Sequence, residues 1–290
     1  MNNLPLVSIL MPSYNSKDYI SIAIQSVLDS TYINFELIIT DDNSTDGTYE
    51  IAKSFEEQDK RVKVIKNDKN YGDYPNRNQA ASYAKGKYLK YVDHDDYIYP
   101  YGLEQLVFFM EQFPDAGYGL CSLPQHQTKV YPFQLTPEEA YKMNYFEMEL
   151  FHKAPLSAII KRKVFEEVGG FTGKPFLGDF EMWHLLSQKY SVVLMPIGIV
   201  WYRKHANQES RKLQKDPREH FEYFIVGKNL INHKNCPLNQ ENKKKIVEYY
   251  KKKLAEKILS AAKHHSIQKA FELKKVSELS WLQTLKYKFI

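Results

Sequence analysis

Hydrophobic residues in the first hundred positions fall into short runs separated by stripes of helical spacing. The runs cover residues 6–11, 35–40, 61–66 and 88–92, and their β-branched and aromatic content predicts strands. The stripes predict helices that start after Ser16, near Thr48 and near Pro75, with Ser16 as the N-cap of the first. Strand and helix alternate four times, which predicts an α/β fold with a mostly parallel central sheet and helices on both faces.

The pattern changes beyond residue 100. A stripe over residues 103–110 predicts one more helix, ended by Pro114, and residues 118–122 predict a further strand. Residues 123–151 are rich in aromatic residues and are expected to be irregular, with most aromatic side chains in the core. The tail from residue 240 onward is expected to be helical, with an apolar stripe at Ile246, Tyr249, Tyr250, Leu254, Ile258 and Leu259.

Charge divides the chain. Residues 1–203 hold 20 Lys and Arg against 26 Asp and Glu, a net charge of −6, whereas residues 204–290 hold 20 against 9, a net charge of +11. This change predicts a boundary near residues 204–215. The 290 residues, 43% of them hydrophobic, suffice for one large domain with an appendage.

The cysteines and the apolar runs indicate the cellular compartment of the protein. Cys121 and Cys236 lie far apart and form neither a disulfide framework nor a metal cluster. No secretory signal and no apolar run long enough to span a bilayer are seen. We therefore expect a cytoplasmic protein.

Acidic residues gather where the strand at residues 88–92 ends. Asp93, Asp95 and Asp96 follow it within four positions, at the strand end where open α/β sheets bind ligands. Like charges so close repel one another unless a cation lies among them, and Mn²⁺ or Mg²⁺ carrying phosphate oxygens would suit them. The alternative is a solvated acidic turn before the next helix.

Four pieces of sequence carry a resemblance to a known family. They are residues 7–15, residues 41–48, residues 70–72 with Arg77 and Asn78, and Gly86 with residues 93–96 and Pro100. In this order and spacing they resemble the nucleotide-binding half of inverting family 2 glycosyltransferases with a GT-A fold, and the resemblance continues more loosely to about Ser210. It implies a Rossmann-like GT-A catalytic domain over residues 1–210, with a nucleotide-sugar half to residue 100 and an acceptor half beyond it, and a basic helical extension over residues 211–290.

The resemblance also implies roles on the donor side. The nucleotide-sugar pocket would be lined by Pro12, Ser13, Tyr14, Asn15, Asp41 and Asp42. Tyr14 would stack on the base and Asp42 would accept from its ring N–H; the alternative for Asp42 is a charge favoured by a helix N-terminus.

The resemblance further implies contacts with phosphate for Arg77 and with a metal for acidic residues among positions 93–96. Arg77 would pair with phosphate, or else be an exposed helix charge. Asp93 would face the ribose or the metal, Asp95 would bind the metal, and Asp96 would order the loop. The His94 side chain is expected to point away from the metal and not to bind it.

On the acceptor side, the resemblance places Asp179 at the general base, which takes the proton of the acceptor hydroxyl. Its alternative role is a helix N-cap, and Glu181 is the fallback base. Gly178 departs from the family's pattern, because it stands where the first acid of a pair is usual. His205 would approach the metal or pyrophosphate, and Arg203 would neutralise phosphate.

Together these features predict a metal-dependent, inverting glycosyltransferase that moves a single sugar. The donor would be a nucleotide-diphosphate-sugar, with UDP favoured, and the acceptor a hydroxyl of a glycan or lipid-linked molecule in bacterial surface polysaccharide synthesis. The Gln-x-x-Arg-Trp motif of processive synthases is absent. One alternative is a nucleotidyltransferase, although residues 12–15 do not form the glycine-rich loop it would need; another is a non-catalytic nucleotide-sugar-binding or assembly protein, suggested by Gly178.

Lysines at 243–245, 251–253 and 257 surround the apolar stripe of the tail. Such a basic helix can lie on the anionic inner face of a membrane as a peripheral contact, or pack on the catalytic domain or a second subunit. Packing or self-association is the favoured interpretation. Nucleic-acid binding is not expected, because no recognition motif accompanies the charge.

Overall fold

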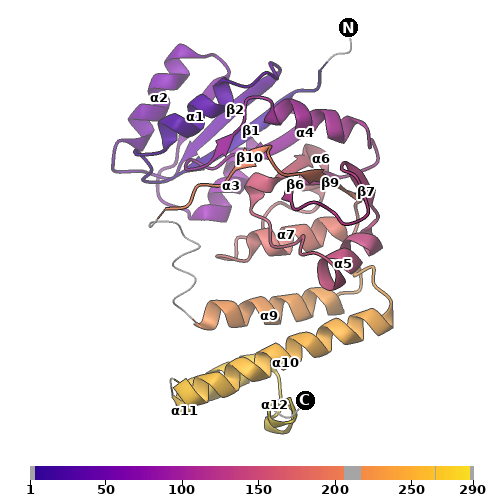
Figure 1. Cartoon of the computed structure of the whole chain (residues 1–290). Helices are drawn as coiled ribbons and strands as arrows, with labels where there is room; N and C mark the ends of the chain where they lie inside the picture. The colour runs from indigo at the N-terminus through magenta and orange to yellow at the C-terminus, as the bar shows by residue number, and fades with distance from the viewer. Residues whose placement is uncertain (1–3, 206–216, 265, 288–290) are drawn as a thin grey trace. The chain divides into compact units, whose positions relative to one another are not determined.

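A computed structural model describes residues 4–205, 217–264 and 266–287 (Figure 1). The chain divides into two compact units, Met1–Lys204 and His205–Ile290. The boundary predicted between residues 210 and 211 lies in the segment 206–216, outside the described residues, as do Gln208, Glu209 and Ser210 of the resemblance.

The first unit is built on an eight-stranded sheet in the order β3-β2-β1-β4-β8-β6-β9-β7. Its strands are β1 Val7–Ser13, β2 Phe35–Asp41, β3 Val62–Lys66, β4 Tyr88–Tyr91, β6 Tyr118–Leu123, β7 Phe133–Leu135, β8 Ala158–Lys161 and β9 Val192–Pro196. The first four strands in the order are parallel to one another, and β6 is parallel to β9. Strand β8 runs antiparallel to β4 and β6, and β7 runs antiparallel to β9. The predicted α/β fold with a mostly parallel sheet is confirmed.

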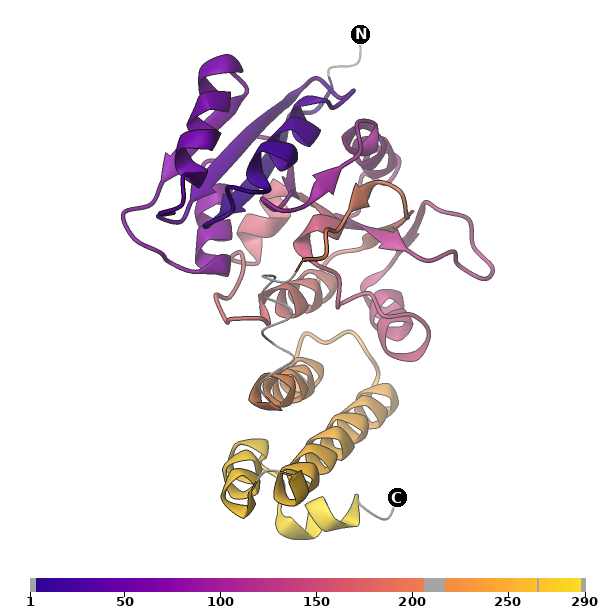
Figure 2. The same ribbon diagram turned by 60° about the vertical axis from the view of Figure 1, so that its left-hand side comes forward.

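Helices cover both faces of this sheet (Figures 1 and 2). They are α1 Ile20–Leu28, α2 Thr48–Gln58, α3 Asp73–Ser82, α4 Gly102–Glu111, α5 Pro137–Phe146, α6 Arg162–Glu167 and α7 Gly178–Ser187. Successive side chains of a strand point to opposite faces. Accordingly Val7, Ile9 and Met11 of β1 share one core with α1, α2 and α4, while α3 packs on β1 and β2 from the other side. A separate two-stranded sheet pairs β5 Tyr97–Ile98 with β10 Val200–Trp201.

Two local predictions were wrong. Ser16 does not cap α1, because a turn separates it from the helix: its carbonyl oxygen, not its side chain, accepts from the N–H groups of Tyr19 and Ile20. Residues 123–151 are not simply irregular, since they contain β7 and α5. Helix α5 begins with a capping box between Thr136 and Glu139 and a proline at its first turn.

The second unit consists of helices α9 Pro217–Asn232, α10 Gln240–His264, α11 Ile267–Ser277 and α12 Trp281–Lys286. Helix α10 packs against the other three. Ile246, Tyr250, Leu254 and Ile258 of the predicted stripe are buried, whereas Tyr249 is 52% exposed. Leu254 and Ile258 belong to a core formed by residues of this unit. In the part of the chain that the structure describes, no helix is both long and apolar enough to cross a membrane.

Candidate active site

The strand ends bring the predicted donor-side residues to one edge of the sheet. Strand β1 ends with Pro12 and Ser13, and Ser13 lies directly opposite Asp41 at the end of β2. Strand β4, on the other side of β1, runs parallel to it and leads into Asp93. Carboxyl ends of parallel strands form the usual ligand crevice of an open α/β sheet. The sequence motifs are therefore neighbours in space.

At the facing ends of β1 and β2, two buried polar atoms have no protein partner. They are the Oγ of Ser13 and the Oδ1 of Asp41; the Oδ2 of Asp41 accepts from the backbone N–H of Ser44 at 2.9 Å. Buried polar groups in proteins are nearly always satisfied by protein, water or ligand. A bound polar molecule could therefore bond to the Ser13 hydroxyl, which can donate and accept, and to the Asp41 Oδ1, which can accept.

Two loops beside these atoms are tied together through Asn15. Its backbone N–H donates to Ser44 Oγ at 2.9 Å, and its side-chain oxygen accepts from Thr45 N–H at 2.9 Å. Asn15 and Asn43 both have positive φ, at 44° and 62°, a conformation that asparagine tolerates better than most residues. Tyr14 is 45% exposed, so its ring is open to a stacking partner.

Asp42 has contacts that the sequence did not reveal. Its buried carboxylate accepts from the side-chain amide of Asn67 at 2.8 Å and from the backbone N–H groups of Tyr71 at 2.9 Å and Gly72 at 2.8 Å. Asp42 thereby holds the turn that precedes α3. Its contact with a nucleotide base stays a prediction.

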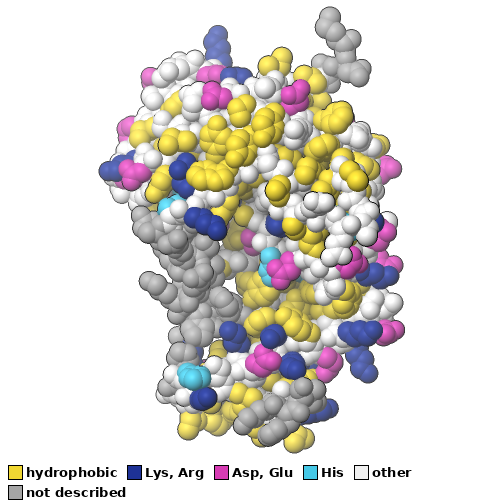
Figure 3. Space-filling view, in the orientation of Figure 1, with side chains coloured by type: hydrophobic (Ala, Val, Ile, Leu, Met, Phe, Trp, Pro, Cys, Tyr) yellow, Lys and Arg dark blue, Asp and Glu magenta, His cyan; other side chains and the backbone are white. Residues whose placement is uncertain are grey.

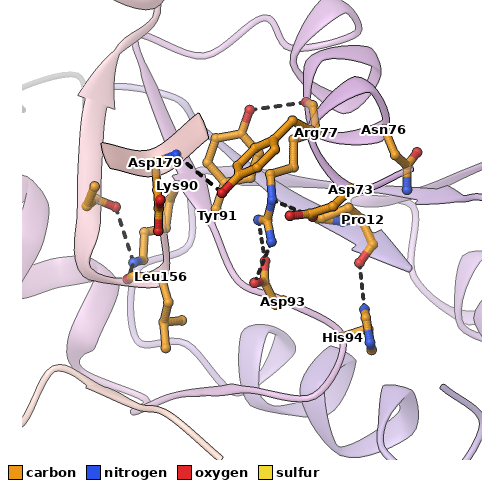
Figure 4. Close-up of polar contacts among 12 residues, drawn as sticks. Pro12, Asp73, Asn76, Arg77, Lys90, Tyr91, Asp93, His94, Leu156 and Asp179 are labelled. Atoms are coloured by element: carbon orange, nitrogen blue, oxygen red, sulfur yellow. Dashed lines mark hydrogen bonds and ion pairs between the residues drawn. The ribbon is translucent and has the colours of Figure 1, made fainter. Parts of the chain in front are cut away.

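Arg77 is buried between two carboxylates (Figure 4). Its Nη1 and Nη2 donate to the two oxygens of Asp93 at 2.6 and 2.8 Å, and its Nε donates to Asp73 Oδ1 at 2.8 Å. The guanidinium also lies over the ring of Tyr91, 5.6 Å from its centroid. Three of its five N–H donors are directed at carboxylates, so Arg77 positions Asp93; a contact with phosphate stays a prediction.

The carboxylates that follow β4 differ from one another. Burial alone would raise the pKa of Asp93, but the guanidinium of Arg77 holds it below its usual value. Burial and the neighbouring Asp93 and Asp95 raise the pKa of Asp96 to about 8. Arg203, just after β10, donates its backbone N–H to Asp96 at 3.0 Å and its Nε to the carbonyl of Asp95 at 2.7 Å. Asp96 and Arg203 thus order the acidic loop.

His94, between these carboxylates, donates from Nδ1 to the carbonyl oxygen of Pro12 at 2.9 Å (Figure 4). This bond ties the acidic loop after β4 to the end of β1. His94 therefore has a structural contact, and its expected absence from the metal ligands stays a prediction.

The resemblance implies that the acidic loop after β4 holds a divalent cation. Among residues 4–205, 217–264 and 266–287, no group of three or more His, Cys, Asp and Glu side chains is arranged to hold a metal. Mg²⁺ and Mn²⁺, however, are commonly held by one or two carboxylates, with substrate phosphates and water completing the shell. Asp95 is partly exposed and Asp93 is fixed by Arg77, so the donor set fits a cation of that kind.

Asp179 lies in the first turn of α7 and is partly exposed. Its Oδ1 accepts from the backbone N–H of Phe180 at 2.7 Å. Burial raises the pKa of Asp179 to about 6, although the Phe180 hydrogen bond and the charge of Arg77 oppose the shift. A carboxyl group with this pKa is largely ionised at neutral pH and can accept a proton.

Glu181 is engaged elsewhere. The side chain of Thr172 donates to its Oε2, and Lys174 Nζ donates to its Oε1 at 2.6 Å. It is buried and tethers the loop before α7. These contacts favour Asp179 over Glu181 as the base.

His205 begins the second unit. Its predicted approach to the metal or pyrophosphate stays a prediction.

Comparison with known proteins now adds to this geometry. The model of the family described as "Glycosyl transferase family 2" matches residues 8–169, which is more than half of the chain. The chain belongs to glycosyl transferase family 2.

Curated relatives of this family 2 chain include the putative teichuronic acid biosynthesis glycosyltransferase TuaG of Bacillus subtilis, 41% identical over 138 residues, 46% of this chain and 54% of that protein. Another is the UDP-Glc:alpha-D-GlcNAc-diphosphoundecaprenol beta-1,3-glucosyltransferase WfaP of Escherichia coli, 41% identical over 108 residues, 37% of this chain and 42% of that protein. The chain spans about half the length of these relatives.

Solved structures share the fold. S. aureus TarS 1–349 in complex with UDP-GlcNAc matches with a TM-score of 0.71 at 18% identity, covering 90% of this chain and 76% of the TarS 1–349 chain. The mannosyltransferase PcManGT of Pyrobaculum calidifontis, in complex with GDP-Man and Mn²⁺, matches with a TM-score of 0.65 at 16% identity, covering 99% and 84%. The GT-A fold expected of this family 2 chain is thereby confirmed.

Two residues near the motifs of this family 2 chain were missed. Lys90 on β4 is fully buried, donates to the backbone carbonyls of Leu156 and Ala158, and has its pKa lowered by burial to about 8. A lysine inside an apolar strand was the only signal in the sequence. Tyr74 lies against Gly178, a contact between residues so distant in sequence that no local pattern predicts it.

Proposed function

We propose that the protein transfers one sugar from a nucleotide-diphosphate-sugar donor to a hydroxyl of a glycan or lipid-linked acceptor, inverting the anomeric carbon. The observation that carries the proposal is geometric: the backbone N–H of Asp179 meets the hydroxyl of Tyr74 on α3 at 3.3 Å, about one turn from Arg77 on the same helix. Arg77 in turn holds Asp93 at the end of β4. The proposed base, Asp179, and the proposed donor-binding residue Asp93 are therefore both held by residues of α3.

The relatives support the substrate classes. TuaG is named for teichuronic acid biosynthesis, and WfaP for UDP-Glc and a diphosphoundecaprenol-linked acceptor. TarS binds UDP-GlcNAc in its crystal structure. We propose a UDP-sugar as donor and a lipid-linked glycan as acceptor, in bacterial surface polysaccharide synthesis.

On the donor side, the exposed ring of Tyr14 would stack on the base, while Ser13 Oγ and Asp41 Oδ1 would bond to the nucleoside. Asp93 and Asp95 would hold Mn²⁺ or Mg²⁺. When bound, such a cation neutralises the pyrophosphate and the departing nucleoside diphosphate. Arg77 keeps Asp93 ionised and fixed for this task.

On the acceptor side, Asp179 would act as general base. The acceptor oxygen attacks the anomeric carbon from the face opposite the diphosphate, and its proton passes to the Asp179 carboxylate. As the new C–O bond forms, the bond to the diphosphate breaks and its electron pair stays on the phosphate oxygen. Inversion at the anomeric carbon follows from this single displacement.

The test compares Asp179→Asn with Asp115→Asn, an exposed aspartate beyond α4. Removing a general base should lower transfer about 10²- to 10⁴-fold, with binding of the nucleotide retained, whereas Asp115→Asn should transfer normally. Transfer is measured with UDP-sugars and a polyprenyl-diphosphate-linked sugar. Unchanged transfer by Asp179→Asn would remove it from its role; a wild-type protein that binds nucleotide without transferring would support a non-catalytic protein instead.

We further propose that the helical unit contacts an anionic membrane surface. Ile267, Phe271, Leu282 and Leu285 of α11 and α12 expose 47–81% of their surface, and the rings of Phe271 and Trp281 lie 5.0 Å apart. Figure 3 shows hydrophobic and basic side chains intermixed over this unit, and residues 204–290 carry a net charge of +11. Apolar residues beside lysines suit anionic headgroups.

Co-sedimentation with vesicles containing phosphatidylglycerol tests this contact. Phe271→Ser with Leu282→Ser should reduce binding, whereas Val130→Ser, which alters an 89% exposed residue of the first unit, should not. Failure of the wild-type protein to bind such vesicles at low salt would end the proposal.

A further inference from the structure

The space beside Gly178 is filled by another residue. A Cβ built on Gly178 would lie 2.7 Å from two ring carbons of Tyr74 and 2.8 Å from a third. Real Cβ atoms do not approach other atoms so closely, and the obstacle is a buried ring, not the end of a flexible chain. No side chain fits at position 178 while Tyr74 keeps its place.

The ring of Tyr74 is held by its surroundings. It is 6% exposed, and its centroid lies 5.2 Å from that of Phe171. Phe171 is fixed in turn by Asn78 of α3, which donates to the Phe171 carbonyl at 2.8 Å and accepts from its N–H at 2.9 Å. Helix α3 therefore clamps the segment before α7 and sets the position of Tyr74.

The hydroxyl of Tyr74 reaches the first turn of α7. It accepts a hydrogen bond from the backbone N–H of Asp179 at 3.3 Å. Burial raises the pKa of Tyr74, so the phenol keeps its proton at neutral pH. Burial raises the pKa of the Asp179 carboxyl and the charge of Asp73 adds to this, while the charge of Arg77 and the neighbouring Tyr74 side chain lower it.

We infer that Tyr74 is a positioning residue for Asp179: its ring occupies the space of the missing side chain at position 178, and its hydroxyl fixes the turn that carries the base. The inference rests on the proposed transfer reaction. It explains how a chain with glycine at position 178 keeps an ordered base at position 179. A phenol from α3 then occupies the place of the first acid of the pair, which is missing at Gly178.

The test compares Tyr74→Phe with Tyr118→Phe. Tyr74→Phe keeps the ring beside Gly178 and removes only the hydroxyl. Tyr118→Phe removes a buried hydroxyl that bonds Ser187, at the far end of the same helix α7. Both variants lose one hydrogen bond to α7, but only the first loses it beside Asp179.

Wild-type kcat should fall on the acid side of about pH 6, where Asp179 takes up its proton. Tyr74→Phe should move this limb to higher pH and lower kcat about two- to tenfold, the effect of losing one hydrogen bond, with KM for the donor unchanged. Tyr118→Phe should keep the wild-type pH profile. A wild-type profile and kcat for Tyr74→Phe would overturn the inference.

A second pair of variants tests the space-filling role. Gly178→Glu alone should lose transfer, because the new side chain meets the Tyr74 ring. Tyr74→Ala combined with Gly178→Glu should recover part of it; a double variant no more active than Gly178→Glu would contradict this role. If the wild-type protein transfers no sugar from any donor, the proposed function fails instead, so the two failures are distinguishable.

Discussion

The donor and acceptor halves of the candidate site each contain an aspartate, Asp93 and Asp179, and the two carboxyl groups lie in opposite electrostatic surroundings. Asp93 faces the guanidinium of Arg77 through two hydrogen bonds, which hold its pKa low. Asp179 accepts from a neutral donor, the backbone N–H of Phe180, and burial raises its pKa to about 6. Under the proposed reaction, Asp93 would be the permanent anion that binds the donor and Asp179 the proton acceptor.

Helix α3 links the two halves. Its first turns place Asp73 and Arg77 toward Asp93, and Tyr74 toward Asp179. The two aspartates therefore differ in pKa partly because each contacts a different residue of α3: Asp93 contacts Arg77, and Asp179 contacts Tyr74. Changing those residues should break the contrast in measurable ways.

The largest effect is expected from Arg77→Met. This change leaves the partly buried carboxylates of Asp73 and Asp93 without their buried cation, and breaking a buried ion pair by removing one partner costs about 3–5 kcal/mol. The free energy of unfolding, measured with urea, should fall by that amount.

Lys142→Met is the matched control, because it removes the cation of an exposed pair with Glu138. Exposed pairs contribute about 0–1 kcal/mol. Equal losses for Arg77→Met and Lys142→Met would show that Arg77 is not the charge partner on which the donor half depends.

A smaller effect, of opposite sign, is expected from Asp179→Asn. Because the folded state raises the pKa of Asp179, this group stabilises the fold below about pH 4, and that contribution is lost as the pH rises through about 6. The asparagine variant should therefore be more stable than the wild type at pH 8, by about 1–2 kcal/mol given the partial exposure of the group, and the gap should close toward pH 4. Urea unfolding at the two pH values measures it; a gap that does not change with pH would contradict the raised pKa.

The smallest effect is expected from Glu181→Gln. Its side chain tethers Thr172 and Lys174, and an amide oxygen can still accept from one of them. Transfer should fall less than about tenfold, well short of the loss expected for removal of a general base. A loss as large as that of Asp179→Asn, measured in the same transfer assay, would move the base to Glu181.

The donor half of the fold was largely predictable because its signals are local. Strand and helix periods follow from neighbouring residues, and polar clusters such as Asp41–Asp42 and Asp93–Asp96 mark the strand ends. Parallel pairing then brings these clusters together at one edge. The capping box at Thr136 and Glu139 was also readable, and neglecting it made residues 123–151 look irregular.

The remaining features depend on contacts between distant residues. Arg77 meets Asp93, Asp42 meets the turn at Tyr71, and Tyr74 meets Gly178 only after the sheet and its helices have assembled. Single-sequence periodicity carries no information on such pairs. The pKa values of the carboxylates follow from these pairs and from burial, so they too lay beyond prediction from the sequence.

Thermal unfolding with UDP, GDP, dTDP and CDP, each with and without Mn²⁺, tests the donor site most directly. A nucleotide at a hundredfold excess over its dissociation constant should add about 2.7 kcal/mol of stability. We predict a metal-dependent increase in Tm with one nucleotide, UDP, and loss of the metal dependence in Asp95→Asn. No increase with any nucleotide, with or without Mn²⁺, would contradict a nucleotide-sugar site at the ends of β1, β2 and β4.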